Sequence, residues 1–422
     1  MINTSDTDAY LPQANSYQPL RSVANGQIKG SVIDTQDEAL VSQIRRAIGG
    51  TFAEKNILDY EAEVDETCDQ LIQVIHQSQQ FDLFAITGGF QADFLSKIAF
   101  GEEAQHLQAG ADSSYLSFHS RFRHWMQWQA MPYLELLWCK TPYLIPYFKA
   151  KTHPPLWARM ADLKLQSRLA EPEQRSSGLK KPDLLEKYLR GGERRGDKLP
   201  LEAIPRMVSS TISAGFDTTA FTMTTMLYFL CRTPSTMEKL CRELDEAHLT
   251  TRPSFHDTQH LKYLGAVMKE TMRLYPFLQL LLEREAPSGG ATVCGKHLPA
   301  GAIVGCHPSI SHRDPALYGQ DADMFRPERW LTVCPEKLSV MDKASLGFGN
   351  GKRICIGRHL AEMEIKTVVP RLLLAFNVSV MEPSLQRLWP ILRRWSYSHD
   401  IFTSLAADIV HVRLRLSTRI TR

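Results

Sequence analysis

The sequence predicts a mainly α-helical fold with small β-sheets, organised as one large domain. Apolar residues recur at helical spacing over several long segments, whereas strand-like runs are few and short: 291–294, 303–306 and 409–416. No Pro-, Gly- or Ser-rich linker divides the 422 residues. Because 43% of them are hydrophobic, the chain can build a large core.

Helical patterns follow one another along most of the chain. Residues 34–77 carry apolar side chains at helical intervals, including Ile44, Leu58 and Leu71. The stretch 201–231 is expected to form a long helix, with Pro205 near its start and Pro234 just beyond its end. We further expect helices at 236–249, 261–274 and 357–374, and an exposed loop around a short helix at 169–198.

Composition narrows the class of protein. A formal charge of +3 gives no reason to expect a nucleic-acid partner. No apolar run approaches the roughly 18–20 residues that cross a bilayer, and the polar N-terminus does not resemble a signal peptide. The eight cysteines are scattered without metal-ligand spacing. We therefore expect reduced thiols in a cytosol-facing protein, seven of them small buried residues.

The eighth cysteine, Cys355, lies in the unusual segment GFGNGKRICIG, residues 347–357, which precedes a helix-like run. Such a turn could bind phosphate, but a P-loop lysine precedes Ser or Thr, and here Lys352 precedes Arg353. A lone cysteine is most often structural. The glycines would let the backbone approach a ligand, and the helix N-terminus with Arg353 would stabilise a thiolate. One thiolate ligand under closely packed backbone suits a haem iron.

The spacing Phe348-x-x-Gly351-x-Arg353-x-Cys355-x-Gly357 resembles the complete haem-ligand signature of the cytochrome P-450 superfamily. This resemblance implies the cytochrome P-450 fold, with haem b between the long central helix and the cysteine loop. It also implies that Cys355 is the axial thiolate ligand of the iron. Arg353 would pair with a haem propionate, and Phe348 would pack beside the sulfur.

The long helix contains AGFDTTA at 214–220, although Gly, Asp and Thr are poor helix formers. Gly215 either permits close helix packing or opens the backbone to make room for a ligand. The stretch is similar to the acid–threonine pair on the oxygen-binding helix of the superfamily. That similarity implies that Asp217 and Thr218 deliver protons while dioxygen is split, and that Ala214 contacts the haem.

Three further residues match a structural feature of the superfamily. Glu270 and Arg273 in KETMRLYP lie three residues apart and so share a helix face, and FRPERW supplies Arg329. Taken alone, Glu270 and Arg273 could be an exposed ion pair that adds little stability. The resemblance implies instead a buried network of all three that supports the cysteine loop.

Other candidate haem contacts are Arg284 and Arg45, which fall where the superfamily places propionate-binding residues, and His307. Val41 stands where relatives usually have Trp or His. The resemblance runs from about residue 31 to the C-terminus and is strongest to fungal microsomal members of the pisatin-demethylase and benzoate-hydroxylase type. Against them the chain is expected to be N-terminally shortened: one domain over 1–422 without the usual anchor, first helix and first strands, which would expose a sheet edge.

The resemblance implies a haem-thiolate monooxygenase that inserts one oxygen atom from dioxygen into a small apolar substrate, in fungal secondary metabolism. Electrons would come from a flavoprotein of the NADPH–cytochrome P-450 reductase type. Lys352, Arg358 and Lys366 are either its basic docking face or ordinary solvated surface. The alternative to an enzyme is a non-catalytic haem-binding remnant, impaired by the N-terminal loss. We expect a monomer.

Phe216, residues 278–282 and the aromatic-rich region 125–148 could line an apolar cavity, although core packing explains each of them as well. In anchored relatives the region that 125–148 resembles faces the lipid surface. Tyr133 and Trp138 therefore indicate peripheral contact with the endoplasmic reticulum membrane.

Overall fold

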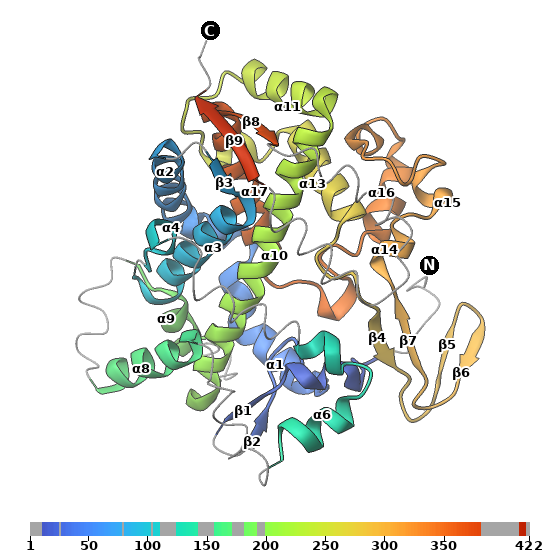
Figure 1. The fold of residues 1–422 in the computed structure, drawn as a ribbon. Helices are drawn as coiled ribbons and strands as arrows, with labels where there is room; N and C mark the ends of the chain where they lie inside the picture. Colours follow the sequence, from blue (N-terminus) through green and yellow to red (C-terminus); the bar gives the residue numbers. More distant parts are fainter. Residues whose placement is uncertain are drawn as a thin grey trace.

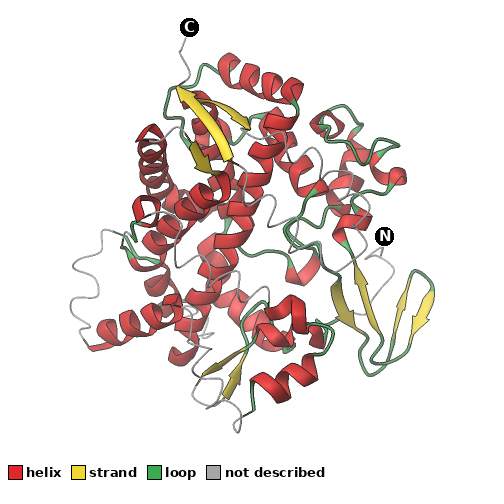
Figure 2. Cartoon of the chain, in the orientation of Figure 1, coloured by secondary structure: helices red, strands yellow, loops and turns green. Residues whose placement is uncertain are grey.

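The computed structural model describes residues 11–24, 27–77, 80–102, 104–109, 124–141, 156–170, 181–191, 199–380 and 413–418. Among these residues helices dominate, and the strands pair antiparallel in four small sheets (Figure 1 and Figure 2). This agrees with the predicted mainly α-helical fold with small β-sheets.

The longer helices are α1 (Glu38–Ile48), α2 (Glu61–Gln77), α3 (Leu83–Phe100), α6 (Pro132–Cys139), α8 (Leu156–Ala170), α10 (Ile204–Arg232), α11 (Pro234–Glu246), α13 (Lys262–Leu274), α16 (Pro335–Ala344) and α17 (Arg358–Ala375). The shorter α-helices are α4 (His106–Ala109), α9 (Leu184–Leu189), α12 (Phe255–Thr258), α14 (Pro308–Ser311) and α15 (Pro315–Tyr318). The 3-10 helices are η1 (Asn15–Leu20), η2 (Gly49–Phe52), η3 (Glu54–Tyr60), η5 (Leu201–Ala203), η6 (Pro327–Trp330) and η7 (Gly351–Arg353).

The sheets are β1 (Ser22–Ala24) with β2 (Gln27–Lys29), β4 (Leu282–Glu285) with β7 (Ile303–Cys306), β5 (Ala291–Val293) with β6 (Lys296–Leu298), and the order β3 (Gln80–Asp82), β9 (Arg413–Thr418), β8 (Phe376–Val380). The N-terminal residues 12–14 run beside β4. Gln13 bridges Arg284, and the Glu285 N–H donates to the Pro12 carbonyl oxygen at 3.0 Å. The sheet edge that we expected to be exposed is therefore partly covered by the chain itself.

Helix α10 lies at the centre of the fold and packs against α3, α8, α9, α13 and α17. Pro205 occupies its first turn, where the missing N–H would have no helical partner. Pro234 begins α11 just past its end, so the predicted long helix is confirmed. One hydrophobic cluster extends from α1 to α17 and includes buried residues of α2, α3, α10 and α13. This continuity supports a single domain, which stays a prediction.

The predicted helices 236–249, 261–274 and 357–374 correspond to α11, α13 and α17. Within 34–77 the expected helical pattern does not hold at Leu58, which is 51% exposed. The chain between α1 and α2 forms the 3-10 helices η2 and η3, which break the 3.6-residue period on which that prediction rested. The short helix expected within 169–198 is α9, and its Leu184 and Tyr188 are fully buried. Most of the loop expected around it, residues 171–180 and 192–198, lies outside the described residues.

The prediction that seven cysteines are small buried residues is also wrong. Among the described residues Cys68 is buried, Cys294 and Cys334 are exposed, and the other four of these seven are partly exposed. Cysteine is often buried, but the elements that carry it decide the outcome. Cys294 lies in the tight turn between β5 and β6, where no core is available.

The carboxylate of Glu270 organises a buried network between α13 and η6. Its oxygens accept hydrogen bonds from Arg273 (Nε and Nη2, both 2.8 Å), from Arg329 Nε at 2.9 Å and from Trp330 Nε1 at 3.0 Å. The Arg326 backbone N–H adds a fifth hydrogen bond at 2.9 Å. Side-chain exposure is 0% for Glu270 and Arg273 and 1% for Arg329. The predicted buried arrangement is confirmed.

Replacing Glu270 with Ala should destabilise the fold by about 3–5 kcal/mol, because the buried Arg273 guanidinium loses its counter-charge and Arg329 keeps only its pairing with Asp321 at 3.1 Å. The measurement is the free energy of unfolding by denaturant titration. Glu238→Ala is the matched control. Glu238 pairs with Arg242 at 3.7 Å on the exposed face of α11, so its loss should cost less than about 0.5 kcal/mol. Equal losses in the two variants would contradict the network.

Candidate functional site

The cysteine loop, residues 347–357, turns tightly between α16 and α17. Gly349 and Gly351 have φ of +70° and +65°, a backbone conformation that residues other than glycine rarely adopt. The Cys355 N–H donates to the Phe348 carbonyl oxygen at 2.8 Å, and the Phe348 ring packs against the main hydrophobic core. Cys355 then leads through Gly357, the N-cap of α17, into that helix. Turn geometry and core packing together fix where Cys355 lies.

The Cys355 thiol is accessible, yet the surrounding protein desolvates it strongly. The two observations agree if the side chain points into a recess of the molecule rather than out into bulk water. Burial raises the pKa of the Cys355 thiol, while the Gly357 backbone N–H, Arg45 and Arg358 act to lower that pKa. A metal ion would complete the deprotonation, because it binds the thiolate form.

The Arg353 guanidinium is held by the N-terminal part of the chain. Its Nε donates to the Glu38 carboxylate at 3.2 Å, and its Nη1 and Nη2 donate to the carbonyl oxygens of Val32 (2.9 Å) and Thr35 (2.8 Å). Among the cations that lower the pKa of the Cys355 thiol are Arg45 and Arg358. A propionate contact of Arg353 stays a prediction, and such a carboxylate would share the guanidinium with Glu38 or displace it.

The other two predicted basic contacts lie on different elements. Arg45 is in the last turn of α1, one turn after the buried Val41, and is close enough to lower the pKa of Cys355. Arg284 lies in β4 opposite Val304, and its Nη1 donates to the carbonyl oxygen of the preceding residue at 2.8 Å. The predicted contacts of Arg45 and Arg284 with haem propionates stay predictions.

His307 follows β7 directly and is partly buried. Among the described residues its Nδ1 atom has no hydrogen-bond partner. Burial lowers the pKa of His307, and the charge of Arg313 lowers it further, so the ring stays neutral near pH 7. A neutral ring with an unused nitrogen can accept or donate one hydrogen bond to a bound group.

On α10 the candidate residues fall on two faces. Ala214 and Thr218, one turn apart, are partly exposed, and the Thr218 hydroxyl donates to the Ala214 carbonyl oxygen at 2.7 Å. Asp217 is 1% exposed, and burial raises the pKa of its carboxyl to about 8. A Cβ on Gly215 would lie 3.3 Å from both Cδ atoms of Leu95 in α3. Close helix packing therefore explains this glycine, and α10 continues unbroken through it.

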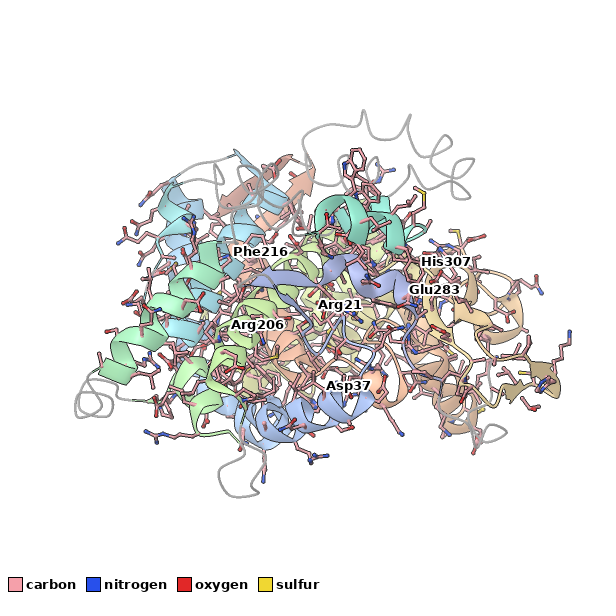
Figure 3. The ribbon with its side chains drawn as sticks, turned by 90° about the horizontal axis from the view of Figure 1, so that it is seen from below. Arg21, Asp37, Arg206, Phe216, Glu283 and His307 are labelled. Carbon is pink, nitrogen blue, oxygen red and sulfur yellow. The ribbon has the colours of Figure 1, made fainter. Side chains whose placement is uncertain are left out.

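The described N-terminal residues, 11–24 and 27–37, contact elements that lie far from them in the sequence. The Arg21 Nε donates to the Asp34 carbonyl oxygen at 3.0 Å, and the Trp125 Nε1 donates to the Ser16 carbonyl oxygen at 2.8 Å. Figure 3 labels side chains of this segment, of α10, of β4 and of the residue that follows β7: Arg21, Asp37, Arg206, Phe216, Glu283 and His307. Phe216 is 1% exposed and belongs to the core, so core packing rather than cavity lining explains it.

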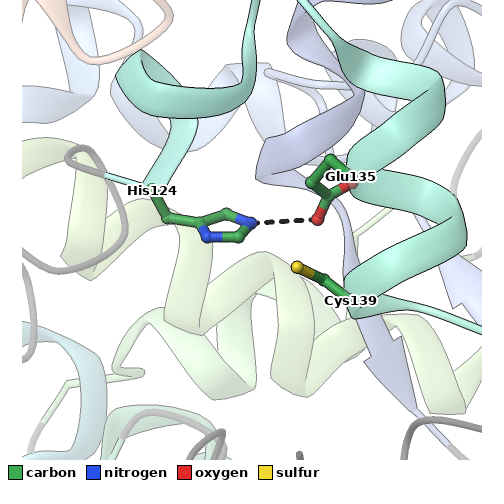
Figure 4. Close-up of side chains that lie close together, drawn as sticks. All are labelled: His124, Glu135 and Cys139. Carbon is green, nitrogen blue, oxygen red and sulfur yellow. Dashed lines mark hydrogen bonds and ion pairs between the residues drawn. The ribbon is translucent and has the colours of Figure 1, made fainter.

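His124, Glu135 and Cys139 present ligand atoms within 4.8 Å of one another, a spacing that a metal ion could use (Figure 4). Their contacts already account for this cluster. His124 Nε2 lies 2.9 Å from the fully buried Glu135 carboxylate, and the Lys140 ammonium lies 2.9 Å from the same carboxylate. Lys140 also donates to the carbonyl oxygens of Gln18 (3.0 Å) and Pro19 (3.2 Å). The cluster therefore fastens α6 to η1.

Sequence reasoning missed Glu38 and the carbonyl groups of Val32 and Thr35, which hold Arg353. Glu38 has only a local signal: it begins α1 directly after Asp37, whose side chain caps the helix by accepting from the N–H groups of Ala39 and Leu40. Its long-range contact with the cysteine loop has no signature in a single sequence. Of the aromatic region, Tyr143 and Phe148 lie outside the described residues.

Comparison with known proteins agrees with this geometry. A family model described as "Cytochrome P450" matches residues 12–395. A cytochrome P450 monooxygenase of Aspergillus terreus is 31% identical, over 88% of this chain and 78% of its own. The monooxygenase cicH of Emericella nidulans is 28% identical over 96% and 81%. Pisatin demethylase of Fusarium vanettenii is 29% identical over 88% and 71%.

A helical fold with one accessible cysteine at the N-terminus of a buried helix is typical of haem-thiolate oxygenases. With the family match over most of its length, the chain belongs to the cytochrome P450 family. It is a monooxygenase, and the non-catalytic alternative is not favoured. The family implies a haem with a cysteine thiolate on its iron, and it normally works with a redox partner and a small substrate.

Asp217→Asn should change how stability depends on pH. The folded-state pKa of about 8 lies above the ordinary value of 3.8, so between those pH values the folded state binds a proton that the unfolded state has released. Asp217 therefore makes the wild type less stable as pH rises, by about 1 kcal/mol per pH unit inside that window. The variant lacks this loss, so its advantage over the wild type should grow from pH 5 to pH 8 in denaturant titrations. A difference that does not vary with pH would contradict the assignment.

Proposed function

We propose that Cys355 is the axial thiolate ligand of haem b and that the chain oxidises a small apolar substrate beside it. The position of Cys355 carries the proposal. Cys355 is accessible although the surrounding protein desolvates its thiol, it follows a turn that requires two glycines, and it precedes the N-terminus of α17. Backbone N–H groups and two nearby arginines favour a thiolate there, so these residues fit a haem iron.

Bound haem supplies an iron centre at which dioxygen is reduced and split. The side chains of this protein would hold the haem in place and offset its charges. Phe348 and Gly351 hold the loop that carries Cys355. Arg45 and Arg358 offset the charge of the thiolate. Among the remaining candidates, Arg284 and Arg353 would bind haem carboxylates and His307 would add a neutral hydrogen bond.

Asp217 and Thr218 are proposed to supply and guide protons. The buried Asp217 carboxyl has a pKa raised to about 8 and so retains its proton at pH 7, which makes it a proton donor. The Thr218 hydroxyl hydrogen is used by the Ala214 carbonyl oxygen, which leaves its oxygen lone pairs to accept a hydrogen bond from water. Thr218 can therefore orient a water molecule with its own oxygen as the acceptor.

The proposed substrate is a small apolar molecule of fungal secondary metabolism, which rests on similarity to fungal monooxygenases. The proposed electron donor is a flavoprotein of the NADPH–cytochrome P450 reductase type. Of the suggested basic docking residues, Lys352 is exposed and Arg358 is partly exposed. Lys366 is less suitable, because its ammonium donates to the Gln259 carbonyl oxygen at 3.0 Å. Lys352 and Arg358 are thus the stronger candidates for the docking face.

Replacing Cys355 with Ser tests the proposed ligand. The reduced, carbon-monoxide-bound protein should lose its thiolate-type Soret band, because a serine hydroxyl does not supply the anionic sulfur. Cys334→Ser is the control, since Cys334 is exposed at the start of α16, outside the cysteine loop, and its loss should leave the spectrum unchanged. A thiolate-type band that persists in the Cys355 variant would refute the assignment.

One face of α6 exposes a group of large apolar side chains: Tyr133 at 62%, Leu134 at 53%, Leu137 at 59% and Trp138 at 60%. The opposite side of the helix is held by the buried Glu135. Among the described residues no helix combines the length and apolar character needed to span a membrane. We propose that this α6 face contacts a membrane surface peripherally, because aromatic and leucine side chains suit the lipid interface.

Trp138→Glu should reduce binding to phosphatidylcholine–phosphatidylserine vesicles by about tenfold or more, since burial of one large apolar side chain contributes roughly 1.5–3 kcal/mol. Co-sedimentation measures the bound fraction. Leu163→Glu is the matched control, because Leu163 is 66% exposed on α8, away from this face. Carbonate washing should release wild-type protein from membranes. Unchanged binding of the Trp138 variant would contradict the proposal.

A further inference from the structure

The imidazole of His312 joins two parts of the chain that meet behind the cysteine loop. The ring is fully buried. Its Nε2 accepts a hydrogen bond from the Leu346 backbone N–H at 2.8 Å, and its Nδ1 lies 2.9 Å from the Arg273 carbonyl oxygen. Because the Leu346 N–H is a donor, Nε2 carries no proton. Nδ1 therefore carries the hydrogen and donates it to the Arg273 carbonyl oxygen. One ring nitrogen thus acts as a donor and the other as an acceptor.

On one side the imidazole is fixed to the buried network. Arg273 Nη1 donates to the His312 carbonyl oxygen at 2.7 Å, while the His312 ring donates back to the Arg273 carbonyl oxygen. Arg273 is itself held by both oxygens of Glu270. The Tyr318 ring lies edge-on to the imidazole at 6.5 Å. The ring thus has little freedom to change its direction.

On the other side the imidazole reaches the start of the cysteine loop. Leu346 directly precedes Gly347, where a Cβ would lie 2.8 Å from Cε and 3.2 Å from Cβ of Met272 in α13. The next residue, Phe348, accepts the hydrogen bond from the Cys355 N–H. A displacement of the Leu346 backbone would therefore also move Phe348, and with it the backbone of Cys355.

We propose that His312 is a positioning residue that couples the Glu270–Arg273 pair to the cysteine loop and thereby holds the Cys355 thiol in its place. This inference rests on the proposed role of Cys355 as the iron ligand only where its test uses the haem spectrum. A neutral imidazole suits the task because it offers one donor and one acceptor on a rigid ring. Burial, together with the charges of Arg273 and Arg313, lowers the pKa of His312 to about 4, so the acceptor persists at neutral pH.

Two conservative variants separate the two hydrogen bonds. In His312→Gln the longer amide side chain reaches the Nε2 position and can accept from the Leu346 N–H. In His312→Asn the amide reaches only the Nδ1 position and can serve the Arg273 carbonyl oxygen alone. We expect the Gln variant to keep the thiolate-type Soret band of the reduced carbon-monoxide complex and the Asn variant to lose part of it.

Hydrogen exchange of the as-purified protein supplies a readout independent of the iron. In the Asn variant the backbone amides of residues 346–355 should exchange about fivefold faster or more, because one hydrogen bond contributes roughly 1 kcal/mol, whereas the Gln variant should exchange as the wild type does. His256→Asn, at an exposed histidine, is the control and should change neither readout. Equal behaviour of the Asn and Gln variants in exchange would overturn the proposal. A wild type without a thiolate-type band would refute the ligand assignment alone, since the exchange comparison still tests His312.

Discussion

The buried carboxylate of Glu270 is the interaction on which the part of the fold behind the cysteine loop depends. A fully desolvated charge is tolerated only if it is paired and hydrogen-bonded, and this one takes donors from two arginines, a tryptophan and a backbone N–H. Those donors come from α13 and from the 326–330 turn, more than 50 residues later. The pairing therefore fixes the position of a segment that has little regular secondary structure of its own.

The cysteine loop depends on the Glu270 network for its position, because few backbone hydrogen bonds of the kind found in helices and sheets hold the loop itself. Its glycines with positive φ permit a tight turn, but they do not determine where in the fold the turn lies. Its location follows from contacts at three places: the Met272 side chain against Gly347, the Phe348 ring in the core, and Arg353 against the N-terminal segment. Val32 and Thr35 thus contribute to the site from the far end of the chain, and residues 12–14 cover the edge of β4.

Much of the fold could be predicted because periodicity is local. Helices α10, α11, α13 and α17 follow from apolar spacing and proline positions, and the spacing around Cys355 identifies the loop. What failed depends on contacts between distant residues. Glu38 meets Arg353 across 315 positions, and the fully buried Arg371 donates to the Pro253 carbonyl oxygen across 118. A single sequence carries no signal for either pairing, just as it did not reveal that Leu58 is exposed.

The same low polarity that makes the Glu270 network strong keeps two other carboxyl groups neutral. Burial raises the pKa of Asp217 in α10 to about 8, and burial raises that of Glu364 in α17 to about 8 although Gln91 donates to it at 2.5 Å. Arginines neutralise Glu270, whereas desolvation is the largest effect on these two groups. A buried acid whose pKa is raised in this way keeps its proton at pH 7, and it is then a proton source rather than a fixed anion. The fold thus holds a charged carboxylate for support behind the cysteine loop and a protonated one on the helix proposed to face the haem.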